Sequence, residues 1–272
     1  MVGEFSKLEY YKNSELKREF NQLGNRIFAM SIAAGVGLSL TVGSIKMGSN
    51  EHSNEKEIYY TAVPHAEAQH EPHVKQEIMK KSVLLDVPLY NQMDHPRLYN
   101  GCEITSLAMI ISYEGIKVSK NELAKEVNRV PLRYSGGEYG NPNDGFVGNM
   151  EDGPGLGVYE GPIFNLAKKY FPDRAENLTG KPFDVLLEKV AKGSPVWIIT
   201  TASLSPAASF ETLNTPGGPV DVTFQMHSVA ITGYDEENIY INDPYGTKNK
   251  KVPRQQFIEA WELMGSQAIV IN

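Results

Sequence analysis

The order of helical and strand-like patterns constrains the fold of this 272-residue chain more than any other feature. Between residues 102 and 192, apolar residues recur at the three- and four-residue spacing of amphipathic helices. From residue 195 onward, runs of β-branched and aromatic residues stand between turn residues, which is typical of strands. Helices followed by strands predict an α+β domain with an N-terminal helical half and an antiparallel sheet. The expected helices lie near 102–114, 118–127, 162–170, 182–192 and 253–265, and the expected strands near 195–200, 227–234, 238–242 and 267–272.

Cys102 is the only cysteine in the chain and opens the first of these helices. A single cysteine excludes an internal disulfide and a multi-thiolate metal site, so it is either a buried apolar residue or a nucleophile. The helix is expected to run to Glu114, and Gly115 follows where a left-handed C-terminal cap is wanted. A thiol in the first helical turn faces backbone N–H groups and the positive end of the helix dipole, which favour the thiolate. Cys102 is therefore the candidate nucleophile.

Residues 27–45 form an apolar run without a charged side chain, between Arg26 and Lys46. A helix of that length spans about 28 Å, close to the thickness of a bilayer core. More basic residues precede the run than follow it, which predicts a cytoplasmic N-terminal segment at 1–26 and an extracellular remainder. We expect a transmembrane anchor or a signal segment at 27–45, with the small residues at 42–44 leaving cleavage open.

Residues 46–83 are polar, charged and without apolar periodicity, which predicts an extracellular linker ahead of a folded domain at 84–272. The linker contains His65, His70 and His73. Ordering a flexible segment around a metal is costly and nothing nearby supplies supporting hydrogen bonds, so we expect these histidines to be solvated and to bind no metal.

The charge of the chain argues against one class of partner. Its net charge is −7 at pH 7, and its isoelectric point is near 5.5. Such a chain has no basic field to attract a polyanion, so we expect no nucleic-acid partner. No Walker-type phosphate loop is present, and we predict no cofactor.

His227 and Asp243 are the candidate partners of the thiol. His227 opens one predicted strand, and Asp243 follows the next one. In a hairpin with a regular four-residue loop, Asp243 would lie opposite Ala230 and point to the wrong face. A loop of three or five residues, or a β-bulge, would pair it with Val229 and bring its carboxylate within reach of the imidazole. We predict one of these irregularities, although each residue taken singly also fits a packing or turn role.

Two long stretches lack periodicity. Residues 131–161 contain nine glycines, and residues 203–218 are rich in Ser, Pro and Gly. A connection of this length inside a compact domain is uncommon unless it is disordered or functional, and interleaved aromatic residues favour a binding surface. Both stretches flank the candidate catalytic residues, so we expect them to form the walls of a cleft.

Six stretches carry a resemblance to a known family: VPLYNQ, GCEITSLAMIISYEG, NDGFVG, GVYEGPI, HSVAITGYD and IYINDPYG. In that order they resemble the bacterial C39-like cysteine peptidases, relatives of the bacteriocin-processing C39 family within the papain-like fold. The resemblance covers about residues 84–272. It implies a papain-like cysteine peptidase fold, with Cys102 as nucleophile, His227 as general base and Asp243 as the orienting carboxylate. It also implies that Gln92 corresponds to the family's oxyanion-hole glutamine.

The chain departs from the exporter-linked members of that family. Those members are joined to exporter membrane and ATPase domains, whereas this chain has no Walker-type loop and one apolar segment. Glu103, directly after the thiol, also distinguishes it from the exporters. The resemblance therefore points to the stand-alone, extracellular branch and argues against leader trimming during export.

The sequence thus predicts a cysteine peptidase that hydrolyses peptide bonds of a peptide or protein substrate through a Cys-His-Asp triad. It would work on the outer face of a bacterial membrane, anchored through residues 27–45, or be secreted if that segment is cleaved. The alternative is a catalytically silent papain-fold module that binds a peptide or cell-wall fragment. A cell-wall amidase would share the nucleophile, but that group's own motifs are not found.

Overall fold

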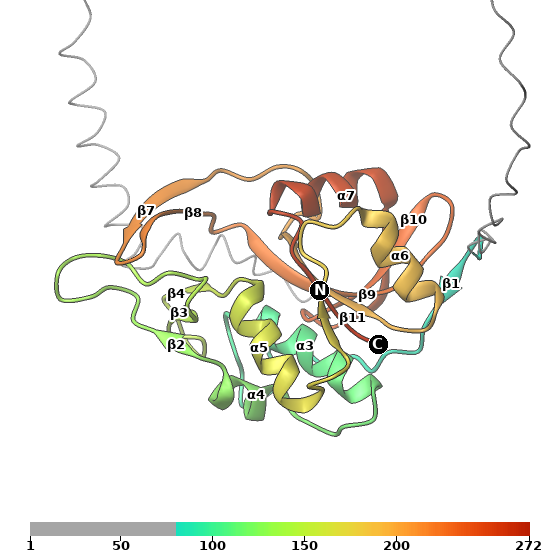
Figure 1. The fold of residues 1–272 in the computed structure, drawn as a ribbon, viewed down its shortest axis with the longest axis horizontal. Helices are drawn as coiled ribbons and strands as arrows, with labels where there is room; N and C mark the ends of the chain where they lie inside the picture. Colours follow the sequence, from blue (N-terminus) through green and yellow to red (C-terminus); the bar gives the residue numbers. More distant parts are fainter. Residues whose placement is uncertain (1–79) are drawn as a thin grey trace, which may run out of the picture. The chain divides into compact units, whose positions relative to one another are not determined.

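A computed structural model describes residues 80–272 of the chain (Figure 1). The predicted cytoplasmic segment (1–26), the membrane segment (27–45) and most of the predicted linker (46–83) lie outside the described residues. Between residues 80 and 272, no helix has both the length and the apolar character needed to cross a bilayer.

The helices of the described region follow the predicted periodicities. They are α3 (Cys102–Tyr113), α4 (Lys120–Glu126), α5 (Glu160–Tyr170), α6 (Phe183–Ala191) and α7 (Arg254–Leu263). The left-handed cap at Gly115 is confirmed by its φ of 94°. At the start of α4, Ser119 and Glu122 form a capping box, in which each side chain accepts a hydrogen bond from the other residue's backbone N–H.

Helix α5 begins earlier than its sequence pattern indicates. Pro162 was expected at its first position, but the helix starts at Glu160, which makes the proline its third residue. The first turn of a helix has no intrahelical acceptors for its N–H groups, so a proline there loses no hydrogen bond.

The second half of the domain is built around a seven-stranded antiparallel sheet. Its order is β11-β10-β9-β6-β12-β5, with β1 beside β9. The strands are β1 (Val83–Leu84), β5 (Ala175–Asn177), β6 (Val196–Thr201), β9 (Met226–Tyr234), β10 (Asn238–Asp243), β11 (Thr247–Pro253) and β12 (Ala268–Ile271). The four predicted strands correspond to β6, β9, β10 and β12, and the predicted helices-then-strands order is confirmed.

Two apolar layers cover the sheet, as the alternation along β6 illustrates. Trp197 and Ile199 belong to the cluster formed with α3, α4 and α5. Val196 and Ile198 belong to the cluster formed with α6 and α7. Successive side chains of a strand point to opposite faces, so one fully buried strand contributes to both cores. Figure 1 shows α6 and α7 on the side of the sheet opposite to α3, α4 and α5.

The two stretches without periodicity in the sequence contain short strands. Residues 131–161 hold β3 (Phe146–Gly148) and β4 (Gly155–Gly157), which form a small sheet with β2 (Arg129–Val130). The second stretch enters the hairpin of β7 (Glu211–Thr215) and β8 (Gly218–Val222). Strands of three residues rich in glycine are too short to show a two-residue periodicity, which is why the sequence pattern missed them.

The hairpin and the small sheet pack on each other. The Tyr139 N–H donates to the Asn214 carbonyl at 2.9 Å, and the Tyr159 hydroxyl donates to the Asp221 carbonyl at 2.7 Å. A third apolar cluster fills the space between them, made of Tyr139, Val147, Leu156, Leu213 and Val222. The two stretches therefore form one unit, seen at the left of Figure 1.

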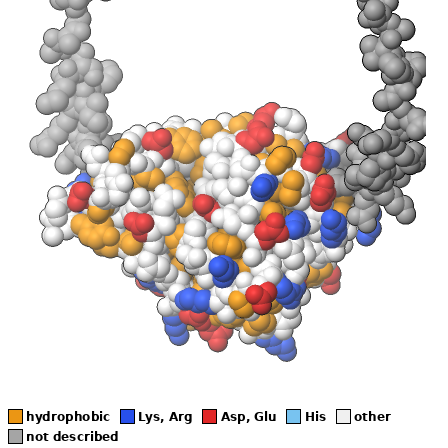
Figure 2. All heavy atoms as spheres, viewed as in Figure 1, with side chains coloured by type: hydrophobic (Ala, Val, Ile, Leu, Met, Phe, Trp, Pro, Cys, Tyr) orange, Lys and Arg blue, Asp and Glu red, His pale blue; other side chains and the backbone are white. Residues whose placement is uncertain are grey.

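The outer surface carries mixed charge. Figure 2 shows acidic and basic side chains interspersed over the face of the domain that is seen in Figure 1. This face therefore has no extended field of one sign.

Candidate active site

The hairpin of β9 and β10 contains the predicted irregularity. Ile239 pairs with Tyr234 and Tyr240 with Gly233, as a four-residue loop dictates, but Ile241 pairs with Ile231. Thr232 is thus an extra residue on β9, a β-bulge that shifts the register by one. This shift places Asp243 in line with Val229 rather than with Ala230. Of the two predicted irregularities, the β-bulge is confirmed, and the hairpin loop keeps its four residues.

His227 and Asp243 consequently meet across the two strands. His227 Nε2 lies 3.0 Å from Asp243 Oδ1, and both side chains are buried. The same Oδ1 accepts the Tyr245 N–H at 3.0 Å, and Lys250 Nζ lies 3.2 Å from Oδ2. The carboxylate is thereby fixed from three sides and holds the imidazole in one orientation.

The pairing sets the protonation of both groups. Burial opposes the charge on His227, but the charge and hydrogen bond of Asp243, together with Cys102, raise the pKa of His227 to about 9. Burial would also raise the pKa of Asp243, but the imidazole, the Tyr245 N–H and Lys250 together lower it. The carboxylate therefore favours the protonated form of the imidazole, which is the form that His227 reaches when it takes a proton.

Cys102 is the first residue of α3, as predicted, and is fully buried. The thiol is coupled electrostatically to His227, because Cys102 is among the groups that raise the pKa of the imidazole, while the buried His227 Nδ1 accepts no hydrogen bond from another group of the described residues. The preceding Gly101 fits because it has no side chain, since a Cβ there would lie 2.5 Å from the Cβ of Leu98. The close approach of Leu98 thus defines where the helix, and with it the thiol, begins.

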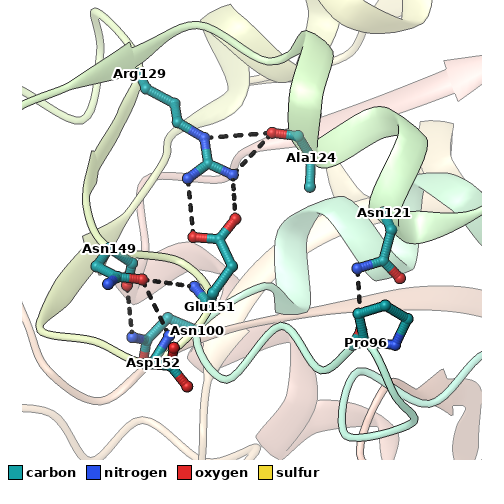
Figure 3. Close-up of polar contacts among 8 residues, drawn as sticks. All are labelled: Pro96, Asn100, Asn121, Ala124, Arg129, Asn149, Glu151 and Asp152. Atoms are coloured by element: carbon teal, nitrogen blue, oxygen red, sulfur yellow. Dashed lines mark hydrogen bonds and ion pairs between the residues drawn. The ribbon is translucent and has the colours of Figure 1, made fainter.

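A polar network holds the loop that leads into Cys102 (Figure 3). The Asn100 N–H donates to the Met150 carbonyl at 2.9 Å, and its side-chain amide donates to the Asn149 carbonyl at 3.1 Å. Arg129 binds the neighbouring Glu151 with two hydrogen bonds and donates to the Ala124 carbonyl at the end of α4. These bonds tie the loop before the nucleophile to α4 and to the small sheet.

Gln92 connects the two halves of the site. Its backbone N–H donates to the Pro244 carbonyl, next to Asp243, at 2.8 Å. Its buried side-chain Nε2 donates to the Tyr99 carbonyl at 2.8 Å and to the Leu98 carbonyl at 3.4 Å, whereas Oε1 has no hydrogen-bond partner. The amide therefore lies in the loop beside the nucleophile, with its N–H groups directed to backbone carbonyls.

Two further residues of the site were not identified from the sequence. The ring of Tyr245 stacks on His227 with centroids 5.1 Å apart and an interplanar angle of 20°. Lys250 reaches Asp243 from β11, a polar strand that has no apolar pattern to predict it. The position of Tyr245 within the NDPYG turn was the only available signal, because a residue two positions after an aspartate turns back toward its carboxylate.

The arrangement offers a thiol, an imidazole and a carboxylate in series. A nucleophile, a base in contact with it and a third group that orients the base are the parts that nucleophilic catalysis requires. The chemistry needs no metal, and residues 80–272 contain no cluster of three or more potential metal ligands.

One family model and one curated relative match this chain over most of its length. A model of the Peptidase_C39 like family matches residues 84–269. The uncharacterized protein YvpB of Bacillus subtilis strain 168 is 54% identical over 198 residues, which cover 73% of this chain and 79% of that protein.

Solved structures extend the comparison. A crystal structure from Bacillus anthracis, assigned to the C39-like peptidases, superposes with a TM-score of 0.68 at 46% identity, covering 71% of this chain and 98% of that one. Xylellain, a cysteine protease from Xylella fastidiosa, gives a TM-score of 0.38 at 17% identity over 71% of this chain and 86% of that one. The family model covers nearly all of the α+β domain described above, and the chain therefore belongs to the Peptidase_C39 like family.

Proposed function

We propose that the chain is a cysteine peptidase in which Cys102, His227 and Asp243 act as nucleophile, general base and orienting carboxylate. The hydrogen bond of the His227 ring to Asp243 and its electrostatic coupling to Cys102 carry this proposal. This arrangement joins Cys102 to two residues that lie more than a hundred positions further along the sequence, in the order that nucleophilic catalysis requires.

The reaction follows from the positions of these atoms. The proton of the Cys102 thiol moves to His227 Nδ1, and the resulting Sγ thiolate attacks a peptide carbonyl. The imidazolium then returns the proton to the leaving amine, and water hydrolyses the thioester with His227 again acting as base. Asp243 stays ionised and stabilises the imidazolium throughout.

Gln92 and the backbone N–H of Cys102 would stabilise the tetrahedral intermediate. The Cys102 N–H belongs to the first turn of α3, where a helix supplies no acceptors. Gln92 Nε2 would exchange its long 3.4 Å contact with the Leu98 carbonyl for the oxyanion and keep its bond to Tyr99. Removal of one such donor typically lowers the rate about a hundredfold or more.

A mixture of peptides tests the proposal. The purified chain should cleave a subset of the peptides, and a thioester on Cys102 should be detected by mass spectrometry after rapid acid quench. Cys102→Ala and His227→Ala should abolish cleavage, whereas an exposed histidine in the same domain, changed by His95→Ala, should leave it intact. Retention of a peptide or a cell-wall fragment without cleavage, unchanged by His227→Ala, would instead identify a binding module.

We further propose that residues 27–45 anchor the chain with residues 46–272 outside a bacterial membrane. The length of the uncharged run and the excess of basic residues before it support this orientation. In a Cys102→Ala background, a membrane-impermeant maleimide should label Ser49→Cys on intact cells and should label Ser6→Cys only after lysis. Labelling of both on intact cells, or of neither, would contradict the orientation, and loss of residues 1–45 from the mature chain would indicate cleavage.

A further inference from the structure

Glu103 follows the candidate nucleophile on α3, and its carboxylate contacts the thiol. Cys102 Sγ donates to Glu103 Oε2 at 3.3 Å, and the Val158 N–H donates to Oε1 at 3.3 Å. The indole N–H of Trp197 donates to the Glu103 backbone carbonyl at 2.9 Å. The residue is thus fixed at both ends, and its carboxylate lies between the thiol and the backbone of Val158, directly after β4.

The surroundings of Glu103 are shaped around the carboxylate. A Cβ on Gly157 would lie 2.3 Å from Glu103 Oε1 and 2.2 Å from the Met226 methyl group. Gly157 also has a φ of 89°, a conformation that residues with a side chain rarely adopt. The glycine leaves the space that the carboxylate occupies beside the thiol.

The carboxylate is buried without a compensating cation. Glu103 has no exposed surface, and within the described domain it forms no ion pair with a lysine, arginine or histidine. Asp243 differs in this respect, because it pairs with both His227 and Lys250. The two carboxylates of the site therefore have different electrostatic partners.

The two carboxylates act on opposite ends of the Cys102–His227 pair. Asp243, held by Lys250 and by the Tyr245 N–H, stabilises the imidazolium that forms when His227 takes the thiol proton. Glu103 touches the other end, where a thiolate would place a second negative charge 3.3 Å from Oε2. Like charges at this distance disfavour ionisation.

We propose that Glu103 restrains the nucleophile: its carboxylate holds the proton on Cys102 Sγ and opposes its transfer to His227 Nδ1. This inference rests on the proposed function, because it assigns Glu103 a role in tuning the nucleophile of that reaction. Glu103 touches the reacting sulfur and so belongs to the catalytic residues. Its substitution changes the pH at which the thiol becomes reactive.

Alkylation measures this property directly, because Cys102 is the only cysteine of the chain. The second-order rate of labelling by iodoacetamide would be followed from about pH 5 to about pH 9. The full-length protein, Glu103→Gln, His227→Ala and the control Glu114→Gln would be compared. Glu114 follows the last residue of α3, so its substitution removes the same charge from the opposite end of the same helix. Burial slows labelling in all four proteins, and the pH of the rising limb is therefore the quantity compared.

The rising limb of the labelling-rate profile should lie about 1 to 3 pH units lower in Glu103→Gln than in the unchanged protein. The profile of Glu114→Gln should superpose on that of the unchanged protein. A Glu103→Gln profile that superposes on the unchanged protein, or moves to higher pH, would overturn the restraint. If His227→Ala leaves the profile unchanged and all proteins label as an ordinary thiol, the proposed function fails as well.

Two further measurements cover a Glu103→Gln protein that does not fold. Glu103→Asp keeps the charge but places it one methylene group further from the thiol. The rising limb of its labelling-rate profile should therefore move to lower pH by a smaller amount than in Glu103→Gln. In the unchanged protein, the ultraviolet absorbance of the thiolate should grow with rising pH. Absorbance that is already complete at about pH 5 would overturn the proposal, because the carboxylate would then be holding no proton on the sulfur.

Discussion

Asp243 accepts a hydrogen bond from His227 at 3.0 Å only because β9 contains one extra residue. That residue, Thr232, lies between His227 and the hairpin loop and shifts the pairing with β10 by one position. The bulge converts a pairing that would turn the carboxylate away into one that aims it at the imidazole. The orientation of the base therefore depends on a local irregularity in the sheet and not on the hairpin loop.

The first prediction concerns the charge of Asp243. Asp243→Asn keeps the shape of the side chain but removes the charge that stabilises the imidazolium, and its amide does not fix the required tautomer. We expect kcat/KM to fall by about two to four orders of magnitude. Lys250→Met, which removes a partner of Asp243 without touching His227, should cost about tenfold or less. Equal losses in the two variants would show that the carboxylate acts only through packing.

The raised pKa of His227 predicts how stability depends on pH. The unfolded pKa is about 6.5 and the folded pKa about 9, so the folded state binds the proton more tightly. The resulting stabilisation is fully present below about pH 6.5 and is lost as the pH rises through about 9. Urea unfolding in a Cys102→Ser background, which removes thiol titration, should show the decline over a narrower part of this window, because Asp243 alone then raises the pKa of His227.

The matched control for this decline is His227→Gln in the same background. Its free energy of unfolding should change less between about pH 6.5 and about pH 9 than that of the parent, because the raised group is absent. Parallel curves for the two proteins would contradict the coupling between His227 and Asp243.

Much of the helical half could be predicted because its apolar residues face one continuous core. In α3, Ile104, Leu107, Ala108 and Ile111 are all buried, and their spacing alone located the helix and the thiol at its start. The same reasoning located β6, β9, β10 and β12, which are buried on both faces. Periodicity is informative where a segment contributes several residues to a core.

The remaining features depend on contacts between distant segments, which periodicity does not encode. The need for an irregular hairpin was predictable from the positions of His227 and Asp243, but its location at Thr232 was not. The 131–161 stretch is ordered by its packing on the β7–β8 hairpin, and Lys250 reaches the site from an otherwise polar edge strand. Glu103 was noticed as a family marker, yet its contact with the thiol follows only from the space left by Gly157.

Tyr245 is expected to support catalysis by covering the imidazole. Its ring stacks on His227, which is hydrogen-bonded to Asp243. Tyr245→Ala should lower kcat/KM by about two- to tenfold, the range expected for loss of one aromatic pair. Tyr245→Phe keeps the ring and serves as the control. An unchanged kcat/KM in Tyr245→Ala would show that the stacked ring does not support the imidazole.

The two glycines that bound α3 provide the last prediction, because the same substitution has a different physical cost at each end. At Gly101 an added Cβ would lie 2.5 Å from the Cβ of Leu98, so Gly101→Ala should destabilise the domain by about 1 to 3 kcal/mol and displace the thiol. Because small displacements of a nucleophile are costly, kcat/KM should fall by about tenfold or more. At Gly115 the added Cβ meets open space, but the φ of 94° costs an L-residue about 1 to 2 kcal/mol.

Urea unfolding and kcat/KM, measured on both variants, separate these effects. Gly115→Ala should lose stability and keep its activity per folded molecule, whereas Gly101→Ala should lose both. Full activity in Gly101→Ala would mean that Leu98 yields to the new methyl group, and that the position of Cys102 is set instead by the bonds of Asn100 to the 149–150 loop.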